Sequence, residues 1–174
     1  FDMNEAFIFD SIRSPRGKNK NGSLCQLTPV DLLSKLMLAL EKKYQLDTSL
    51  INDVIIGCVM PVNDQGANIG KIAAQYSGWD VDIPSMQINR CCGSGLEAIN
   101  LAAMKIRSGW EDLIVSGGIE CMSRVPIGAD GGPMAFETKV SLRTNYVPQG
   151  IGADLIATIE GFTRQDLDCL LYTS

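Results

Sequence analysis

One cysteine stands in surroundings that favour nucleophilic chemistry. Cys92 follows a short apolar segment, 83–88, that reads as a strand closed by Asn89. It precedes a segment, 94–107, that has no internal proline and is rich in good helix formers. A thiol at this junction lies at a helix N-terminus, where unpaired N–H groups and the helix dipole favour an anion. Since the thiolate is the reactive form of cysteine, we expect Cys92 to be a nucleophile.

The glycines beside Cys92 suit acyl transfer. Gly93 and Gly95 allow a sharp turn and let a substrate carbonyl approach the backbone closely. A thiolate can then attack that carbonyl while backbone N–H groups stabilise the oxyanion. The alternative is that Cys92 is a packed core thiol, and the residue pattern by itself leaves both readings open.

The other cysteines are expected to be small buried thiols of a reducing compartment. No C-x-x-C pair and no histidine occurs among the 174 residues, which makes a zinc site improbable. Cys91 is expected to face the core rather than to form a strained disulfide with Cys92. The remaining cysteines are Cys25, Cys58, Cys121 and Cys169.

Several polar residues have both a structural and a functional reading. Asn89 is expected to fix the strand-to-helix turn through side-chain hydrogen bonds. Gly66 could cradle an anion. Glu120 and Arg124 could act in catalysis, but a buried structural ion pair or a loop anchor is favoured.

Two glycine-containing loops do not match known nucleotide-binding patterns. The basic loop 17–22 lacks the spacing of a P-loop. The segment 128–132 lacks the preceding strand and following helix of a dinucleotide site. We therefore expect neither phosphate binding at the first loop nor a nicotinamide cofactor at the second.

Composition excludes several classes of protein. Hydrophobic residues make up 45% of the chain, which is enough for a real core. The net charge of −5 argues against a general nucleic-acid binder, which would carry a basic stripe. No apolar stretch is long enough to span a bilayer, and the first residues lack the features of a signal peptide. We expect a protein of the cytoplasm or of an organelle matrix.

Strand-like and helix-like segments alternate along the chain, which predicts βαβ units and a mostly parallel sheet. Thr28 and Pro29 are typical of a helix start, and Asp31 complements the helix dipole. The expected strands are 6–12, 53–59, 83–88 and 113–116, and the expected helices are 28–40, 69–76 and 94–107.

Two further segments are unusual. The helix 94–107 is apolar on most sides, which is typical of a helix buried all round. Helical and strand periodicity both fail over 123–150, where prolines and glycines are frequent. We expect a long ordered loop or an insertion there, with a functional role.

The sequence resembles a known family. The pattern Asn-x-x-Cys-Gly-Ser-Gly-Leu-x-Ala, which begins at Asn89, is similar to the nucleophile signature of the thiolases, the acetyl-CoA acyltransferases. Four more segments resemble the family in its own order, so that the likeness runs from about residue 5 to residue 168. They are 10–17, 64–68, 117–124 and 149–154.

This resemblance implies a fold, an activity and a catalytic residue. The fold would be a thiolase-like N-terminal α/β domain, a mostly parallel mixed sheet with a buried central helix, over 4–122. The start of a loop subdomain would follow over 123–168, and 169–174 depart from the family pattern. Cys92 would form an acyl-cysteine intermediate, cleaving 3-ketoacyl-CoA with CoA or condensing two acetyl-CoA molecules. The stretch 120–132 resembles the degradative acyltransferases most.

Partners and alternatives follow from the same resemblance. CoA thioesters would be substrates, so no cofactor and no metal is expected, nor a nucleic-acid or membrane partner. A homodimer or homotetramer is expected, with the loop 64–68 at the dimer interface. The alternatives are a related condensing enzyme, of the ketoacyl synthase or hydroxymethylglutaryl-CoA synthase type, and a non-catalytic assembly fragment. Thiolases also carry a second domain with an essential histidine, so this chain is expected to be incomplete and to lack turnover.

Overall fold

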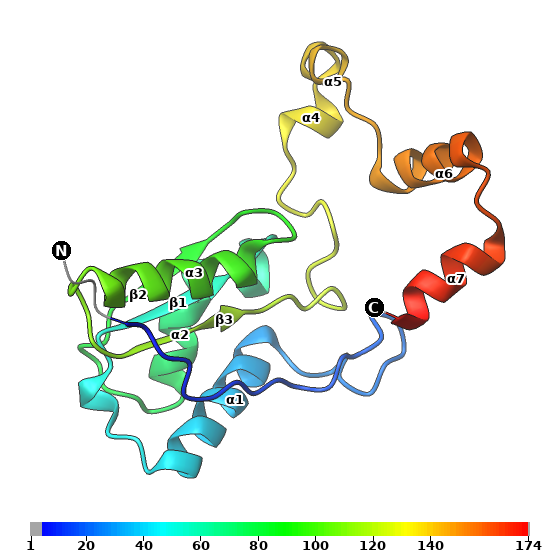
Figure 1. Cartoon of the computed structure of the whole chain (residues 1–174). Helices are drawn as coiled ribbons and strands as arrows, with labels where there is room; N and C mark the ends of the chain where they lie inside the picture. Colours follow the sequence, from blue (N-terminus) through cyan, green and yellow to red (C-terminus); the bar gives the residue numbers. More distant parts are fainter. Residues whose placement is uncertain (1–4, 174) are drawn as a thin grey trace. The chain divides into compact units, whose positions relative to one another are not determined.

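The computed structural model describes residues 5–173; the predicted start of the core at residue 4 lies outside them. Contacts divide the chain into two units, 1–130 and 131–174. The first unit contains a parallel sheet in the order β2-β1-β3 (Figure 1). Its strands are β1 Asp53–Gly57, β2 Ser85–Ile88 and β3 Ile114–Gly118.

Strand β1 is the centre of the core because helices cover both of its faces. Successive side chains of a strand point to opposite faces. Val54 and Ile56 accordingly join one apolar cluster with residues of α1 (Pro29–Tyr44) and α2 (Ile69–Tyr76), whereas Ile55 joins a second cluster with α3 (Ser94–Arg107). Every residue of β1 is buried, as is typical of a central parallel strand.

Two of the predicted helices, α1 and α2, begin at residues whose side chains cap them. In α1, the Thr28 side chain accepts a hydrogen bond from the Asp31 N–H, the Asp31 carboxylate accepts one from the Thr28 N–H, and Pro29 is the first helical residue. Asn68 caps α2 by accepting a hydrogen bond from the Lys71 N–H. The structure confirms the predicted helix start at 28–29 and the predicted helices 69–76 and 94–107. Short 3₁₀ turns, η1 Thr48–Leu50 and η2 Asn63–Gln65, precede β1 and α2.

The expected strand at 6–12 is wrong. This segment has no regular secondary structure, and its apolar residues Phe7, Ile8 and Phe9 are 66%, 77% and 84% exposed. Its Asp10 forms an ion pair of 2.8 Å with Lys43 of α1. An apolar run becomes a strand only where a neighbouring strand accepts its backbone hydrogen bonds, and the described residues supply none here. The described sheet therefore has three strands rather than four.

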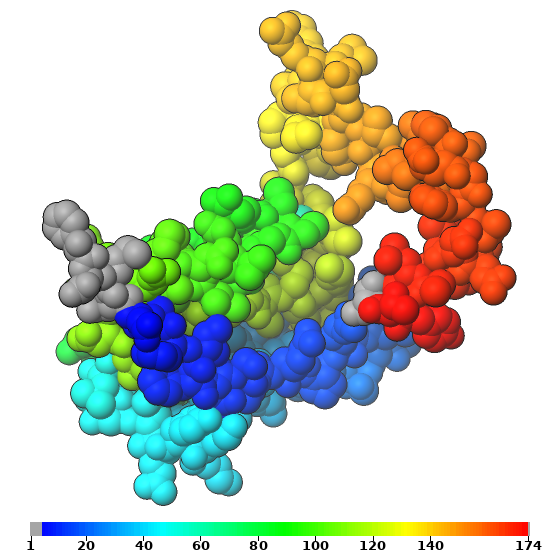
Figure 2. Space-filling model, in the orientation of Figure 1, coloured from blue at the N-terminus to red at the C-terminus, as the bar shows by residue number. Residues whose placement is uncertain are grey.

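Helix α3 is buried on one face only. Ser94, Ala98 and Ala102 lie against the sheet, while the opposite side carries exposed apolar residues. Figure 2 shows α3, in bright green, at the surface of the molecule. The sequence predicts a helix buried on all sides, but in this chain only the side of α3 that faces the sheet is buried.

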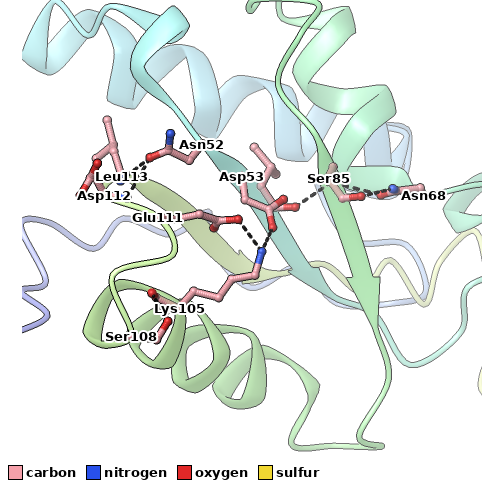
Figure 3. Close-up of polar contacts among 10 residues, drawn as sticks. Asn52, Asp53, Asn68, Ser85, Lys105, Ser108, Glu111, Asp112 and Leu113 are labelled. Atoms are coloured by element: carbon pink, nitrogen blue, oxygen red, sulfur yellow. Dashed lines mark hydrogen bonds and ion pairs between the residues drawn. The ribbon is translucent and has the colours of Figure 1, made fainter. Parts of the chain in front are cut away.

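A buried ionic cluster ties the far end of α3 to the amino end of β1 (Figure 3). Lys105 of α3 donates to the carboxylates of Asp53, at 2.5 Å, and of Glu111, at 2.7 Å. Asp53 is 3% exposed. Burial opposes the charge of Lys105, but its hydrogen bonds to the two carboxylates outweigh this effect and raise its pKa.

The second unit is a chain of helices, each with no buried residue. The expected irregular segment 123–150 contains two of them, so the prediction of a long loop is wrong for residues 133–144. Gly132 precedes a helix that has Pro133 at its first position, so the breakers that suggested a loop mark a helix start instead. The helices are α4 Pro133–Phe136, α5 Thr138–Thr144, α6 Gln149–Glu160 and α7 Arg164–Thr173. No helix within residues 5–173 is long and apolar enough to cross a membrane.

Candidate active site

Cys92 lies where the sheet ends, in the turn between β2 and α3. The register aligns Gly57, Ile88 and Gly118, so the segments that follow all three strands meet at one edge of the sheet. Ligands of parallel α/β folds bind at this carboxyl edge. The Cys92 side chain is exposed there, two residues before the first residue of α3.

Ser94 holds the turn around Cys92. Its buried hydroxyl accepts a hydrogen bond from the Arg90 N–H at 2.9 Å and donates to the Cys91 carbonyl at 2.5 Å. The Ser94 N–H donates to the same carbonyl at 3.0 Å, and the Gly93 N–H donates to the Arg90 carbonyl at 3.1 Å. Cys92 therefore belongs to a turn whose backbone conformation is held by hydrogen bonds.

Asn89 fixes the turn, as the sequence predicts. Its Nδ2 donates to the Val59 carbonyl at 3.0 Å, and its Oδ1 accepts from the Cys91 N–H at 2.8 Å. Cys91 has φ +46°, a left-handed conformation that is uncommon outside glycine. Its side chain is exposed, so the expectation that it faces the core is wrong. The N–H and the carbonyl of Cys91 are both hydrogen-bonded within the turn, and its side chain points to the solvent. Cys91 and Cys92 are free thiols.

Glycines let α3 begin directly above the ends of the strands. A Cβ at Gly57 would lie 2.3 Å from the backbone carbonyl carbon and oxygen of Ser94. A Cβ at Gly118 would lie 3.2 Å from the Cα of Gly95. Gly95 therefore packs against the backbone of Gly118. This contact is separate from the expected role of Gly95, which is to let a substrate carbonyl approach the backbone. This close packing sets the height of the α3 N-terminus over the sheet, and with it the position of Cys92.

A buried glutamine joins the loops at this edge, and sequence reasoning missed it. Gln65 has no exposed surface; its Nε2 donates to Glu120 at 2.7 Å and to the Met60 carbonyl at 2.9 Å, and its Oε1 accepts from the Cys121 N–H at 2.5 Å. Glu120 also accepts from the Val59 N–H at 2.9 Å. No local pattern marks Gln65, because two of its partners, Glu120 and Cys121, lie far away in the sequence.

Glu120 is a loop anchor, one of the two structural roles expected for it. Arg124 does not pair with Glu120: its guanidinium lies 2.9 Å from Asp64, and both of these side chains are more than a third exposed. The Gly66 N–H donates to the Asn63 carbonyl at 3.0 Å, so this amide serves the loop rather than an anion.

The remaining cysteines divide by environment. Cys58 and Cys121 are buried, as expected, but Cys169 is exposed because it lies on a helix without a buried face. Burial raises the pKa of Cys58 from 9.0 to about 11, and the nearby charge of Glu120 adds to the effect. Cys25 is half-buried.

A separate cavity of about 320 Å³ lies beside the basic loop of the first unit. Arg16 and Lys18 line it together with leucines of α1, and Cys92 is not among the lining residues. Within residues 5–173 no group of three or more His, Cys, Asp or Glu side chains could hold a metal ion.

Comparisons with known proteins agree with this geometry. The family model for the thiolase N-terminal domain matches residues 6–170. A 3-ketoacyl-CoA thiolase of Shewanella loihica is 37% identical over 169 residues, which are 95% of this chain and 43% of that protein. The steroid 3-ketoacyl-CoA thiolase FadA6 of Mycobacterium tuberculosis is 30% identical over 99% of this chain and 45% of its own length.

A solved structure gives the same result. The crystal structure of the Bacillus anthracis acetyl-CoA acetyltransferase matches with a TM-score of 0.65 and 33% identity, over 70% of this chain and 30% of that chain. The chain spans less than half the length of these curated relatives. Both the family model and the relatives cover the β2–α3 turn that carries Cys92. The chain belongs to the thiolase family and matches its N-terminal domain.

Proposed function

We propose that the protein containing this chain is an acyl-CoA acyltransferase in which Cys92 forms an acyl-cysteine intermediate. The observation that carries the proposal is the position of Cys92, an exposed thiol at the carboxyl edge of the sheet directly before α3. The relatives named 3-ketoacyl-CoA thiolase support the same substrate class. No cofactor is required, because the CoA thioesters are themselves the substrates.

The reaction has two half-reactions that share one intermediate. The Cys92 thiolate attacks the keto carbon of a 3-ketoacyl-CoA, the bond between that carbon and the α-carbon breaks, and the leaving carbanion takes a proton to become acetyl-CoA. A second CoA thiol loses its proton and attacks the acyl-cysteine, which releases the shortened acyl-CoA and the Cys92 thiolate. Condensation of two acetyl-CoA molecules is the reverse sequence. The Cys92 N–H is suited to stabilise the oxyanion of each addition.

The proton transfers require groups beyond this chain. Near neutral pH histidine is the usual general base, and the 174 residues contain none. We propose that the 174-residue chain by itself is acylated at most once and does not turn over. In the longer protein, which we expect to be a homodimer or homotetramer, the missing groups come from the remaining sequence.

The first prediction tests the nucleophile directly. The sample is a full-length protein in which this chain is followed by the rest of the sequence of a thiolase relative. It is incubated with acetyl-CoA, and the mass added to the peptide that contains Cys92 is measured. We expect one acetyl group on Cys92 and none after Cys92→Ser. Cys169, an exposed thiol on α7, is the internal control. Absence of any acetyl-Cys92 from the full-length protein would disprove the proposal.

A further inference from the structure

Glu120 is held in one place although it is only partly buried. Its two carboxylate oxygens accept separate hydrogen bonds, one from the Val59 N–H at 2.9 Å and one from the Gln65 Nε2 at 2.7 Å. Gln65 is fully buried and bonded to Met60 and Cys121 as well, so it cannot follow Glu120 if the carboxylate moves. The loop after β3 is thereby joined to the loop after β1.

Val59 continues this connection to the nucleophile turn. Its N–H is bound by Glu120, while its carbonyl accepts from the Asn89 Nδ2 at 3.0 Å. Asn89 in turn holds the Cys91 N–H at 2.8 Å. Three hydrogen bonds therefore lead from Glu120 to the residue beside Cys92, although Glu120 lies on a different loop.

The end of this path is a strained residue. A left-handed conformation is unfavourable for a residue with a side chain. Cys91 has φ +46° and keeps it only because Asn89 and Ser94 bind its N–H and carbonyl. Strain of this kind persists where surrounding contacts enforce it, and it is concentrated at functional sites. If Asn89 lost its anchor on Val59, Cys91 would be free to relax and Cys92 would leave its place before α3.

We propose that Glu120 is a positioning residue for Cys92, acting through Val59 and Asn89. The proposal rests on the proposed function, because it assumes that the reactivity of Cys92 matters. Glu120 touches neither Cys92 nor, in this proposal, the substrate. Its role is to keep the β2–α3 turn in the conformation that presents the thiol, and Gln65 supports it.

The decisive experiment measures the rate at which iodoacetamide modifies each cysteine of the native chain, with fragment spectra assigning Cys91 and Cys92. Glu120→Gln keeps the shape of the side chain, but its NH₂ group must face either the Val59 N–H or the Gln65 Nε2, both of which are donors. One hydrogen bond is therefore lost, and we expect Cys92 to react about tenfold more slowly. Cys169 should be unchanged. Glu5→Gln, at an exposed carboxylate of the same unit, is the matched control and should leave Cys92 at its original rate.

A compensating exchange distinguishes positioning from a general loss of stability. In Glu120→Gln combined with Gln65→Glu, the new amide can accept from the Val59 N–H and donate to the new carboxylate, which still accepts from the Cys121 N–H but leaves the Met60 carbonyl without its donor. We expect this double variant to recover part of the lost Cys92 reactivity. Asn89→Asp replaces the donor to Val59 by an oxygen and adds a negative charge that itself disfavours the Cys92 thiolate. It should therefore slow Cys92 at least as much as Glu120→Gln does, and adding Glu120→Gln to it should have no further effect.

Each outcome has one meaning. If Cys92 of the unmodified chain reacts no faster than Cys169, the proposed function fails. If Cys92 is fast and Glu120→Gln leaves it so, only the positioning role fails. Rapid modification of the buried Cys58 would show that Glu120→Gln has unfolded. Asn89→Asp then decides, because Asn89 is exposed, and an unchanged Cys92 rate in that variant overturns the proposal.

Discussion

Two thiols near the same edge of the sheet have opposite environments. Cys58 follows β1 and is 1% exposed; burial, with a further contribution from the charge of Glu120, raises its pKa to about 11. Cys92 is exposed in the turn before α3, a helix whose start has no side-chain cap. Since only the thiolate reacts, burial makes Cys58 inert near neutral pH, whereas the Cys92 side chain is accessible to reagents.

The buried thiol predicts how stability depends on alkaline pH. The pKa of Cys58 is near 9.0 in the unfolded chain and about 11 in the folded one, so rising pH favours unfolding over this interval. The expected loss is about 2–3 kcal/mol. Urea unfolding should show this loss between these pH values in the original chain and a smaller loss in Cys58→Ala. Equal pH dependence in the two proteins would contradict the assigned environment.

Much of the site's local structure could be predicted from the sequence, whereas its support could not. Asn89, Cys92 and the following glycines are adjacent in the chain, and short-range rules of turns and helix starts describe them. The sequence predicts a core position for Cys91, and this is wrong because its left-handed backbone is not visible in its residue type. The contacts of Gln65 and Glu120 span 55 residues, and no local pattern specifies such a pairing.

At the scale of elements, α3 is fixed at both ends by different means. Its first turn rests on glycine backbone, and its last turn is held by Lys105, which bridges Asp53 and Glu111 (Figure 3). Among the described residues, the second oxygens of these carboxylates, Asp53 Oδ1 and Glu111 Oε2, are buried without a partner. Lys105 is therefore the counter-ion on which both carboxylates depend.

Removal of this cation should be costly. Lys105→Met keeps the aliphatic stem but leaves two poorly solvated carboxylates without a counter-ion, which is expected to cost about 3–5 kcal/mol. Lys42→Met, on an exposed helix position of α1, is the matched control and should change stability little. Chemical denaturation of the two variants measures the difference. A loss as small as that of Lys42→Met would show that the cluster does not hold α3.

Helices and strands can be predicted from the sequence where residues close together in the chain determine them. Capping by Thr28 and Asp31 marks α1 in the sequence, apolar spacing marks α2, and a proline-free run of good helix formers marks α3. The segment 6–12 has the composition of a strand, but strand formation depends on a neighbour that composition does not reveal. The helices over 133–144 were missed because proline and glycine begin a helix as readily as they interrupt one.

At the scale of the whole molecule, the outer side of α3 is the most consequential surface. It carries Leu96, Ile99 and Met104, which are 66%, 38% and 55% exposed, opposite the residues that pack on the sheet. Exposed apolar residues grouped on one helix face favour association. The same helix begins beside Cys92, so whatever covers this face also lies near the nucleophile turn.

We therefore expect the 174-residue chain to associate with itself through α3 and not to persist as a monomer at high concentration. Leu96→Glu with Met104→Lys places charges on the outer side of the helix and leaves the buried Ala98 and Ala102 untouched, so it should yield a smaller species without loss of folding. Leu50→Glu, at an exposed leucine outside α3, should not. Light scattering over a range of concentrations distinguishes these outcomes. A monodisperse monomer of the unmodified chain at every concentration would show that the α3 face does not drive association.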